Sequence, residues 1–335
     1  MFPNSTAAGP AVPGYLAVDS GGSGLRVAVG AFGGAPPAQG RSSTPVRTGD
    51  RGIDPAHLLE LVVPLARTLA AEAGVDELTT AVVGAAGFAT LGAALRAELP
   101  GALAGELGVG TVGLAADAVT AYIGALGARP GAALAAGTGL IAIGTDLRSW
   151  RRADGWGHLL GDCGGGAWIG RAGLEAALRA HDGRAGGSAP LLERARERFG
   201  PPPELPGLVY PRPDRAALLA SFAPEVAACA PDDPAATGIL RAAARHMAES
   251  VAAACPESGE PEVACTGGLL NLGEPLLSFL REELARQVPH ARTATAQGDP
   301  LHGCVRLASG LAAGDAVWPE DPRLLCVTDA RKRAT

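Results

Sequence analysis

The chain has 335 residues, which exceeds the size at which one hydrophobic core usually stops growing, so two globular lobes are expected. Hydrophobic residues make up 47% of the chain and charged residues 19%, which is typical of a globular protein and excludes an intrinsically disordered one. The net charge of -6 and a single lysine, Lys332, argue against a nucleic-acid partner, which requires a basic face.

Residues 1–14, MFPNSTAAGPAVPG, are expected to form a disordered tail, and they lack the basic start and apolar run of a secretory signal. Gly, Pro and charged residues interrupt every apolar segment before it reaches the roughly 20 residues that span a bilayer. The sequence therefore predicts a cytoplasmic protein with no membrane partner. The cysteines show no CxxC pair and are predicted to be buried, reduced thiols. They lie at positions 163, 229, 255, 265, 304 and 326.

Short apolar segments bounded by Gly, Pro or Asp predict strands. They are residues 15–20, 25–32, 80–84, 111–116, 132–136, 140–145 and 262–266. Apolar residues recur at helical spacing in 55–74, 166–182, 237–255 and 273–288, and Pro64 is expected to bend the first of these helices. Strands that alternate with helices predict an α/β protein. The Pro-rich stretch 198–214 is predicted to contain no regular secondary structure.

Two segments of the chain resemble each other. YLAVDSGGSGLRVAVG (15–30) and GAALAAGTGLIAIGTD (131–146) each consist of a strand, a turn of small residues and a second strand. This similarity indicates a duplication, with one glycine turn in each lobe. The boundary between the two lobes is expected near Asp117. The backbone N–H groups of such turns can converge on a phosphate, although an ordinary hairpin turn is the alternative. Neither turn matches the Walker or the GxGxxG pattern.

Asp117 stands where a predicted strand ends and a helical stretch begins. It can cap that helix, or it can act as the general base that orients an attacking hydroxyl and accepts its proton in phosphoryl transfer. The base hypothesis rests on its place at the carboxyl end of a strand, where α/β proteins bind ligands, and both roles remain open.

The segment DGWGHLLGDCGGGAWIG (154–170) gathers Asp154, His158, Asp162 and Cys163 among glycines. Carboxylate and imidazole groups suit a hydroxyl-bearing ligand. The alternatives are a buried structural histidine and a helix cap at Asp162, whereas a zinc site is disfavoured by the many glycines. In EVACTGGLLNLGEPLL (262–277), glycines at the end of a strand would let a flat ring approach, or they form a tight turn.

Taken in order, AVDSGGSG, AADA, AAGTGLIA, GWGHLLGDCGGGAWIG and VACTGGLL resemble the N-acetylglucosamine kinase branch of the BadF/BadG/BcrA/BcrD ATPase family. That family lies within the acetate and sugar kinase, Hsp70 and actin superfamily. The resemblance spans roughly residues 15–315. It implies two ribonuclease-H-like lobes with ATP and Mg²⁺ in the cleft between them. The lobes would be residues 15–116 and 117–300, and a C-terminal helix at about 301–325 would complete the first.

The resemblance also implies roles for individual residues. Asp19 would hold Mg²⁺, and Asp117 would be the base on the 6-hydroxyl of an amino sugar. The ATP-binding residues would be Gly21, Gly22, Ser23, Gly137, Thr138, Gly139, Gly267 and Gly268. The sugar-binding residues would be Thr138, Gly155, His158 and Asp162. Expected partners are a small-molecule sugar and a second copy of the chain in a homodimer.

Two departures from the family pattern leave alternatives open. Cys163 stands where relatives often carry Glu, and residues 42–52 contain no Asn. A missing amide weakens recognition of N-acetylglucosamine, so glucosamine, another hexose or a cyclitol are alternative substrates. A dehydratase-activating ATPase would need cysteines for an iron–sulfur cluster, and RPGAALAAGTG has none before the second turn. A non-catalytic sugar or nucleotide sensor would not need both Asp19 and Asp117.

Overall fold

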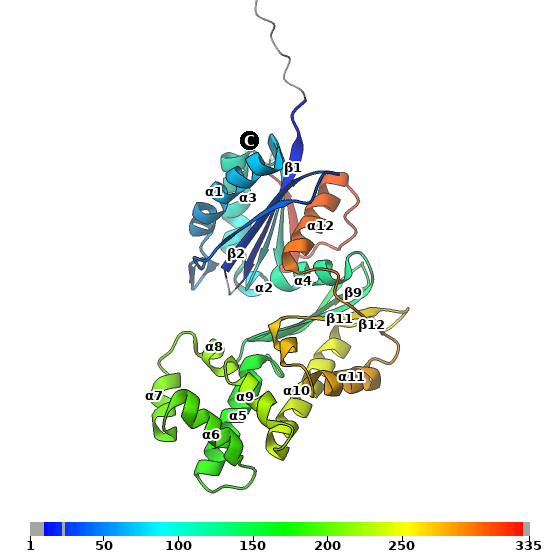
Figure 1. The fold of residues 1–335 in the computed structure, drawn as a ribbon. Coiled ribbons are helices and arrows are strands. Elements are labelled where there is room, and N and C mark those ends of the chain that lie inside the picture. Colours follow the sequence, from blue (N-terminus) through cyan, green and yellow to red (C-terminus); the bar gives the residue numbers. More distant parts are fainter. Residues whose placement is uncertain (1–9, 22–23, 331–335) are drawn as a thin grey trace, which may run out of the picture. The chain divides into compact units, whose positions relative to one another are not determined.

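The computed structural model describes residues 10–21 and 24–330, which divide into two compact units (Figure 1). The first unit is built from the chain up to Ala128, residues 147–150 and the chain from Gln297 onward. The second unit is built from residues 129–146 and 151–296. Residues 1–9 of the expected tail lie outside the described residues, and Pro13 and Gly14 already belong to the first strand.

The first unit is organised around a mixed sheet with the strand order β13-β7-β6-β1-β2-β3. These strands are β1 (Pro13–Gly21), β2 (Gly24–Ala31), β3 (Ala38–Ser42), β6 (Glu77–Ala85), β7 (Thr111–Ala116) and β13 (Leu325–Asp329). Strands β1, β6 and β7 run parallel, whereas β2, β3 and β13 each run antiparallel to their neighbours. A short ribbon is formed by β4 (Thr48–Gly49) and β5 (Gly52–Ile53).

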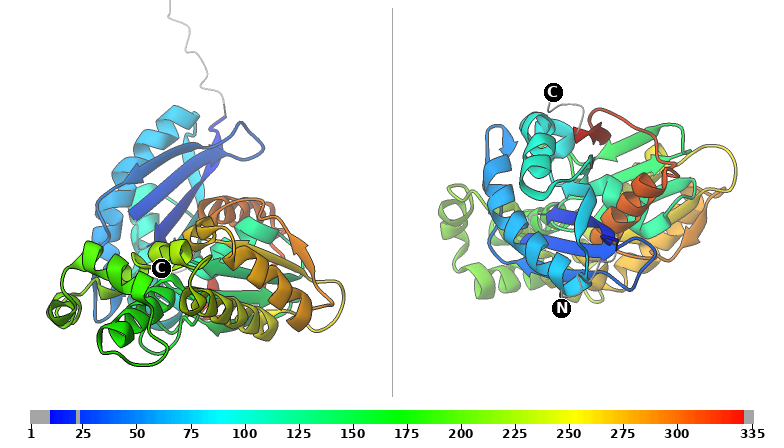
Figure 2. Two further views of the ribbon diagram at one scale, coloured as in Figure 1. Left: turned by 60° about the horizontal axis from the view of Figure 1, so that its bottom comes forward. Right: turned by 90° about the horizontal axis from the view of Figure 1, so that it is seen from above.

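Helices cover both faces of this sheet. They are α1 (Pro55–Ala73), α2 (Phe88–Leu91), α3 (Ala93–Leu107), α4 (Asp117–Leu126) and α12 (Pro300–Ala313). In Figures 1 and 2, α1 and α3 lie on one side of the sheet and the orange helix α12 lies on the other, against α4. Helix α1 begins where the Asp54 carboxylate accepts the N–H groups of Ala56 and His57, and it continues through Pro64 to a left-handed Gly74.

The second unit has a sheet with the order β10-β9-β8-β11-β12, in which β8, β11 and β12 run parallel. The strands are β8 (Gly131–Ala136), β9 (Leu140–Thr145), β10 (Trp150–Asp154), β11 (Glu262–Thr266) and β12 (Arg292–Ala294). The helices are α5 (Gly166–His181), α6 (Ala189–Phe199), α7 (Leu205–Val209), α8 (Arg215–Ala220), α9 (Ala223–Cys229), α10 (Pro234–Ala254) and α11 (Leu276–Gln287). Two 3₁₀ turns are η1 (Pro202–Glu204) and η2 (Gly268–Leu272).

Helix α10 contributes many of the buried residues in the hydrophobic core of the second unit. Its N-cap Asp233 accepts the N–H groups of Ala235 and Ala236, and it also binds the hydroxyl of Ser188, the N-cap of α6, at 2.5 Å. Leu240, Met247 and Val251 of α10 are completely buried among residues of α5, α9 and β8. This packing supports the sheet edge from which the glycine turn projects.

All seven predicted strands and all four predicted helices are present, which confirms the α/β class. The prediction of no regular structure in 198–214 is wrong: this stretch contains the end of α6, the turn η1 and helix α7. Pro202 is the first residue of η1 and Pro206 is the second residue of α7, and in the first turn of a helix a missing backbone N–H costs no hydrogen bond. None of the six cysteines forms a disulfide within the described residues. Only Cys255 and Cys304 are buried, so the prediction of buried thiols is wrong for the other four, which are partly exposed.

The division between the units also differs from the expected boundary at Asp117. Helix α4 belongs to the first unit because it packs closely on α12. A side chain at Gly124 of α4 would collide with the carbonyl oxygen of Asp299, and one at Gly303 of α12 would collide with that of Thr120. Glycines on both helices therefore permit this close approach, and the chain enters the second unit only at Arg129.

Candidate active site

Asp19 lies near the end of β1, directly opposite Arg26 on β2. Its Oδ2 accepts hydrogen bonds from Nε and Nη2 of Arg26 at 3.0 and 2.6 Å. The third nitrogen of the same guanidinium, Nη1, binds Oδ2 of Asp299 at 2.5 Å. Asp299 is the N-cap of α12, where its Oδ1 accepts the N–H of His302. Arg26 thus links the end of β1 to the start of α12.

Burial governs the charge of these carboxylates. Only 8% of Asp19 is exposed, and this burial raises the pKa of its carboxyl group, with the Asp299 charge adding to the rise and Arg26 opposing it. At Asp299 burial also acts to raise the pKa, but the His302 N–H and Arg26 outweigh it, so the pKa of Asp299 is lowered. The arginine therefore serves two carboxylates in different environments.

The first glycine turn begins at Gly21, where a side chain would meet no atom within 4 Å, so the backbone there is open to a ligand. Gly24 ends the turn at a φ of 132°, a conformation that favours glycine. The predicted phosphate-binding residues Gly22 and Ser23 lie outside the described residues.

Asp117 is the first residue of α4 and follows directly from β7. The alternative that it caps this helix is wrong, because the N-cap is Ala116 and makes no side-chain hydrogen bond. The carboxylate of Asp117 is half-buried and accepts the N–H of Ala118 at 2.9 Å. Strand β6 separates β7 from β1, so the strands that carry Asp117 and Asp19 are about 10 Å apart at the same carboxyl edge.

In the second unit, the turn Gly137–Thr138–Gly139 joins β8 to β9. The N–H of Gly137 donates to the carbonyl of Gly139, and the carbonyls of Gly137 and Thr138 accept the N–H groups of Gly166 and Ala167 at 2.8 Å. These last two residues are the first of α5. The turn is therefore anchored to a helix N-terminus, which carries positive dipole charge and favours an anion nearby.

Asp162 connects the polar loop (residues 154–165, which precede α5) to this turn. Its Oδ1 accepts the N–H of Gly157 at 3.0 Å, and the backbone of Leu140 also donates to its carboxylate. A Cβ at Gly139 would collide with Oδ2 of Asp162, so a larger residue there would displace this carboxylate. Burial raises the pKa of Asp162, the Gly157 N–H lowers it, and the charge of Asp154 raises it. The suggested capping role is absent, since the N-cap of α5 is Gly165.

Asp154 organises the same loop from the other side. Its two oxygens accept the N–H groups of Asp162 at 2.6 Å and Cys163 at 2.9 Å. Asp154 and Asp162 both have positive φ, of 60° and 57°, which is uncommon outside glycine and marks a constrained loop. Burial raises the pKa of the Cys163 thiol and Asp154 raises it further, which keeps the thiol protonated and argues against a reactive cysteine.

The remaining predicted residues lie around this loop and the neighbouring strand β11. Within the described part of the chain, the buried Nε2 of His158 has no hydrogen-bond partner. Gly155 has a φ of 75° and packs against Ile141, while its carbonyl accepts Nη2 of Arg152 at 2.6 Å. Gly267 has a φ of 107° and lies against the backbone of Ala136. At Gly268, no atom lies within 4 Å of the position that a Cβ would occupy.

The structure therefore forms two groups of predicted residues. Asp19, Gly21 and Asp117 share the carboxyl edge of the first sheet. Gly137–Gly139, Asp162 and the polar loop share one hydrogen-bonded network in the second unit. Sequence reasoning missed Arg26 and Asp299 altogether. Arg26 follows the glycine turn on the next strand, and this position opposite Asp19 in a hairpin is the signal that could have identified it.

Within residues 10–21 and 24–330, no group of three or more His, Cys, Asp or Glu side chains is arranged to hold a metal ion. Mg²⁺ commonly uses one or two carboxylates together with water and substrate phosphates. Asp19 beside a glycine turn fits a ligand set of that kind. No helix among the described residues is long and apolar enough to cross a bilayer.

Two α/β units, each with a mixed sheet and a glycine turn between its first two strands, define the fold of the actin-like ATPases and the related sugar kinases. The chain belongs to the BadF/BadG/BcrA/BcrD ATPase family, whose model matches residues 18–307. Members of this kinase-like family use ATP. No curated protein matches the sequence significantly.

Several solved structures are similar to the chain. A protein named "Putative N-acetylglucosamine Kinase" from Chromobacterium violaceum is 25% identical with a TM-score of 0.70, over 88% of this chain and 99% of that one. A protein of the same description from Porphyromonas gingivalis is 20% identical with a TM-score of 0.63, over 87% and 97% of the two chains. A ROK family glucokinase from Streptomyces griseus, with glucose and AMPPNP bound, is 20% identical with a TM-score of 0.52, over 90% and 99%.

Proposed function

We propose that the protein is an ATP-dependent kinase that phosphorylates the 6-hydroxyl of an amino sugar, with N-acetylglucosamine as the first candidate. The observation that carries this proposal is the placement of Asp19 and Asp117 at one carboxyl edge of the first sheet. One carboxylate is paired with an arginine and suits a metal ion. The other stands at a helix N-terminus next to the strand, where a general base for a substrate hydroxyl is useful.

In the proposed reaction, Asp117 accepts the proton of the sugar hydroxyl as that oxygen attacks the γ-phosphorus of ATP. ADP leaves, and the sugar 6-phosphate forms. Asp19 would hold Mg²⁺, which when bound neutralises charge on the phosphates. The N–H groups around Gly21 and those of Gly137, Thr138 and Gly139 would bind the phosphate oxygens, and Gly267 and Gly268 would lie beside the adenosine.

The sugar would be held by the polar loop of the second unit. Asp162 and the backbone of Gly155 would bind sugar hydroxyls, and Thr138 would lie beside them. The Nε2 atom of His158 supports this assignment, because a buried polar atom without a protein partner commonly meets a ligand or water. A preference for the N-acetyl group is a further part of the proposal and is supported by the names of the similar kinases. A homodimer remains part of the proposal only as an expectation from the family resemblance.

An ADP-release assay with ATP and Mg²⁺ tests the reaction. N-acetylglucosamine, glucosamine, N-acetylmannosamine, glucose and a cyclitol are compared, and we expect the highest kcat/KM with an amino sugar. Asp117→Asn should lower kcat by about 10² to 10⁴ while ATP affinity stays within about twofold. Asp54→Asn is a matched control in the first unit, because Asp54 only caps α1. Normal turnover of Asp117→Asn, or no turnover with any compound, would contradict the proposal.

A further inference from the structure

A buried cluster lies close to the carboxyl edge of the first sheet, and none of its members has a part in the proposed reaction. In chain order, its residues are Val18 of β1, Gly84 of β6, Thr120 of α4 and Cys304 of α12. All four are buried, and the side chains of Thr120 and Cys304 have no exposed surface. The cluster therefore connects the strand that carries Asp19 to the helix that begins with Asp117.

Gly84 is the point where the two helices meet the sheet. It pairs with Asp19 on β1 and with Ala115 near the end of β7. A Cβ at Gly84 would lie 2.8 Å from Oγ1 of Thr120 and 3.1 Å from Sγ of Cys304. Both distances are shorter than ordinary van der Waals contacts. The absent side chain therefore leaves the space in which α4 and α12 contact the strand together.

Cys304 connects α12 to β1. Its Sγ donates a hydrogen bond to the carbonyl oxygen of Val18 at 3.2 Å, and Val18 directly precedes Asp19. Burial raises the pKa of the Cys304 thiol, and the negative charge of Asp19 raises it further. These effects outweigh the hydrogen bonds and the arginine charge that lower the pKa. The thiol therefore keeps its proton and remains a donor to the strand.

Thr120 connects the same cluster to Asp117. Its Oγ1 donates to the carbonyl oxygen of Asp117 at 2.9 Å, within the first turn of α4. The branched Cβ of Thr120 restricts the rotation of this side chain. A Cβ at Gly303, the residue before Cys304, would collide with the carbonyl oxygen of Thr120, so the backbones of α4 and α12 approach closely here. A shift of α12 at this point would therefore move the start of α4.

We propose that Thr120 and Cys304 are positioning residues for the proposed phosphoryl transfer: they fix how far the metal-binding carboxylate stands from the general base. This inference rests on the proposed roles of Asp19 and Asp117. Both carboxylates act in one step, so their separation enters the rate, and a misplacement of about 1 Å can cost about a hundredfold. Thr120 and Cys304 themselves are completely buried and act only through these carboxylates.

The ADP-release assay tests this inference. Cys304→Ala removes the hydrogen bond to Val18 and leaves a void between β1, α4 and α12. We expect kcat to fall at least about tenfold and the Mg²⁺ concentration for half-maximal turnover to rise at least about threefold, while KM for ATP stays within about twofold. Cys304→Ser retains a donor at this position and should keep kcat within about threefold of the wild type.

Thr120→Val separates the two connections. It keeps the branched shape of the side chain but removes the bond to the carbonyl of Asp117. Because Thr120 acts on the general base and not on the strand of Asp19, we expect kcat to fall at least about fivefold with an unchanged Mg²⁺ requirement. A merely structural role would lower the melting temperature without this difference between the two variants.

Cys255→Ala is the matched control for Cys304→Ala, because Cys255 is a similarly buried cysteine at the end of α10 in the second unit. Both variants should lower the melting temperature by a similar amount, but Cys255→Ala should leave kcat unchanged. Circular dichroism gives each melting temperature, and all turnover is measured at a temperature at which every variant is folded.

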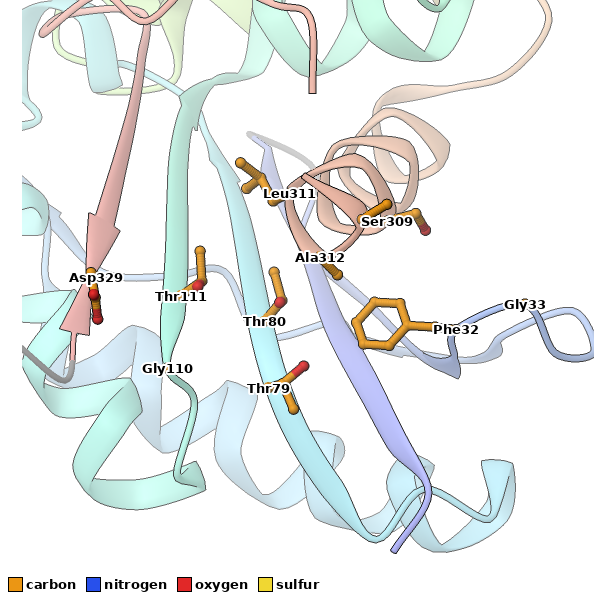
Figure 3. Close-up of a pocket in the computed structure, with 11 residues that line it drawn as sticks. Phe32, Gly33, Thr79, Thr80, Gly110, Thr111, Ser309, Leu311, Ala312 and Asp329 are labelled. Atoms are coloured by element: carbon orange, nitrogen blue, oxygen red, sulfur yellow. The ribbon is translucent and has the colours of Figure 1, made fainter. Parts of the chain in front are cut away.

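Thr80→Val is the matched control for Thr120→Val. Thr80 is a buried threonine that lies four residues before Gly84 on β6, a separation of about 13 Å along the strand. It pairs with Thr111 on β7, which pairs with Asp329 on β13, and Figure 3 shows these side chains in a pocket away from the carboxyl edge. Thr80→Val should leave both kcat and the Mg²⁺ requirement unchanged.

The inference is overturned if folded Cys304→Ala and Thr120→Val keep the wild-type kcat, or if the two control variants lower kcat as much. Should Cys304→Ala not fold, Thr120→Val decides alone, and a wild-type kcat in that variant overturns the inference. A wild-type protein without turnover overturns the proposed function and this inference with it. Normal wild-type turnover with unaffected variants contradicts only the positioning role.

Discussion

Asp19 and Asp162 are carboxylates with the same small exposure of 8%, and each lies beside a glycine turn, yet the two units hold them by different means. Asp19 is held by a guanidinium that is itself partly exposed, whereas Asp162 is held by the N–H groups of Gly157 and Leu140. A side chain can move and exchange its partner, but backbone N–H groups are part of the loop. The comparison indicates that Asp19 can give its oxygen to a metal ion, while Asp162 keeps its position.

The largest expected effect comes from Asp162→Ala. It leaves the N–H groups of Gly157 and Leu140 without their acceptor, and only Leu140 is buried, so the free energy of unfolding should fall by about 1–3 kcal/mol. The loop and the turn Gly137–Gly139 should separate, and sugar affinity should be lost. Urea unfolding and sugar titration measure both effects, with Asp182→Ala at the exposed end of α5 as control. Unchanged stability would show that the loop does not depend on this carboxylate.

Asp19→Ala should affect the metal requirement more than stability. Arg26 keeps its bond to Asp299 and remains partly solvated, so unfolding should change by only about 1 kcal/mol. The Mg²⁺ concentration for half-maximal turnover should rise at least about tenfold, which corresponds to about 1.4 kcal/mol of binding. A Mg²⁺ titration of the kinase reaction gives this value. An unchanged titration would remove Asp19 from the proposed metal site.

Arg26→Gln tests whether Asp19 exchanges partners. If the guanidinium competes with the cation, its removal should strengthen Mn²⁺ binding about fivefold, equivalent to about 1 kcal/mol of lost repulsion. Electron paramagnetic resonance of free Mn²⁺ in the presence of ATP measures this directly. Arg41→Gln is the matched control, since Arg41 pairs with Arg26 from strand β3. Weaker Mn²⁺ binding would instead mean that Arg26 holds Asp19 in place for the metal.

The smallest effect should be the pH dependence of Asp162. Burial raises its folded-state pKa, so the folded protein binds this proton more tightly than the unfolded chain does. Its contribution to stability is therefore greatest at low pH and declines as pH rises through the folded pKa, which is raised above that of an ordinary aspartate. The stability difference between wild type and Asp162→Asn, measured from pH 3 to 7, should follow this decline. A flat difference would contradict the raised pKa.

The strands show how far the fold can be predicted from sequence. All the central strands of the two sheets were predicted, but the four edge strands, β3, β13, β10 and β12, were not. Central strands are buried on both faces and read as apolar runs. Edge strands such as AQGRS in β3 and WRRAD in β10 carry polar and charged residues, because one side meets solvent and charge there prevents further pairing.

The candidate site likewise contains residues that the sequence predicted and a residue whose role it did not predict. Its glycine turns, Asp19, Asp117 and the polar loop were recognisable because each is a local pattern of small and polar residues at the end of an apolar strand. Asp154 stood within that loop, but its role did not follow from the pattern. Its two bonds to the N–H groups of Asp162 and Cys163 require a loop that folds back on itself.

The sequence by itself determined the α/β class, the central strands and the order of the motifs, because these depend on local periodicity and turn chemistry. Only the tertiary structure decided which side chains meet. Arg26 bonds to Asp299, 273 residues away in the chain, because α12 returns to the first sheet and places its N-cap beside β2. Thr80, Thr111 and Asp329 likewise form one row only through strand register, which depends on long-range pairing that no local pattern records.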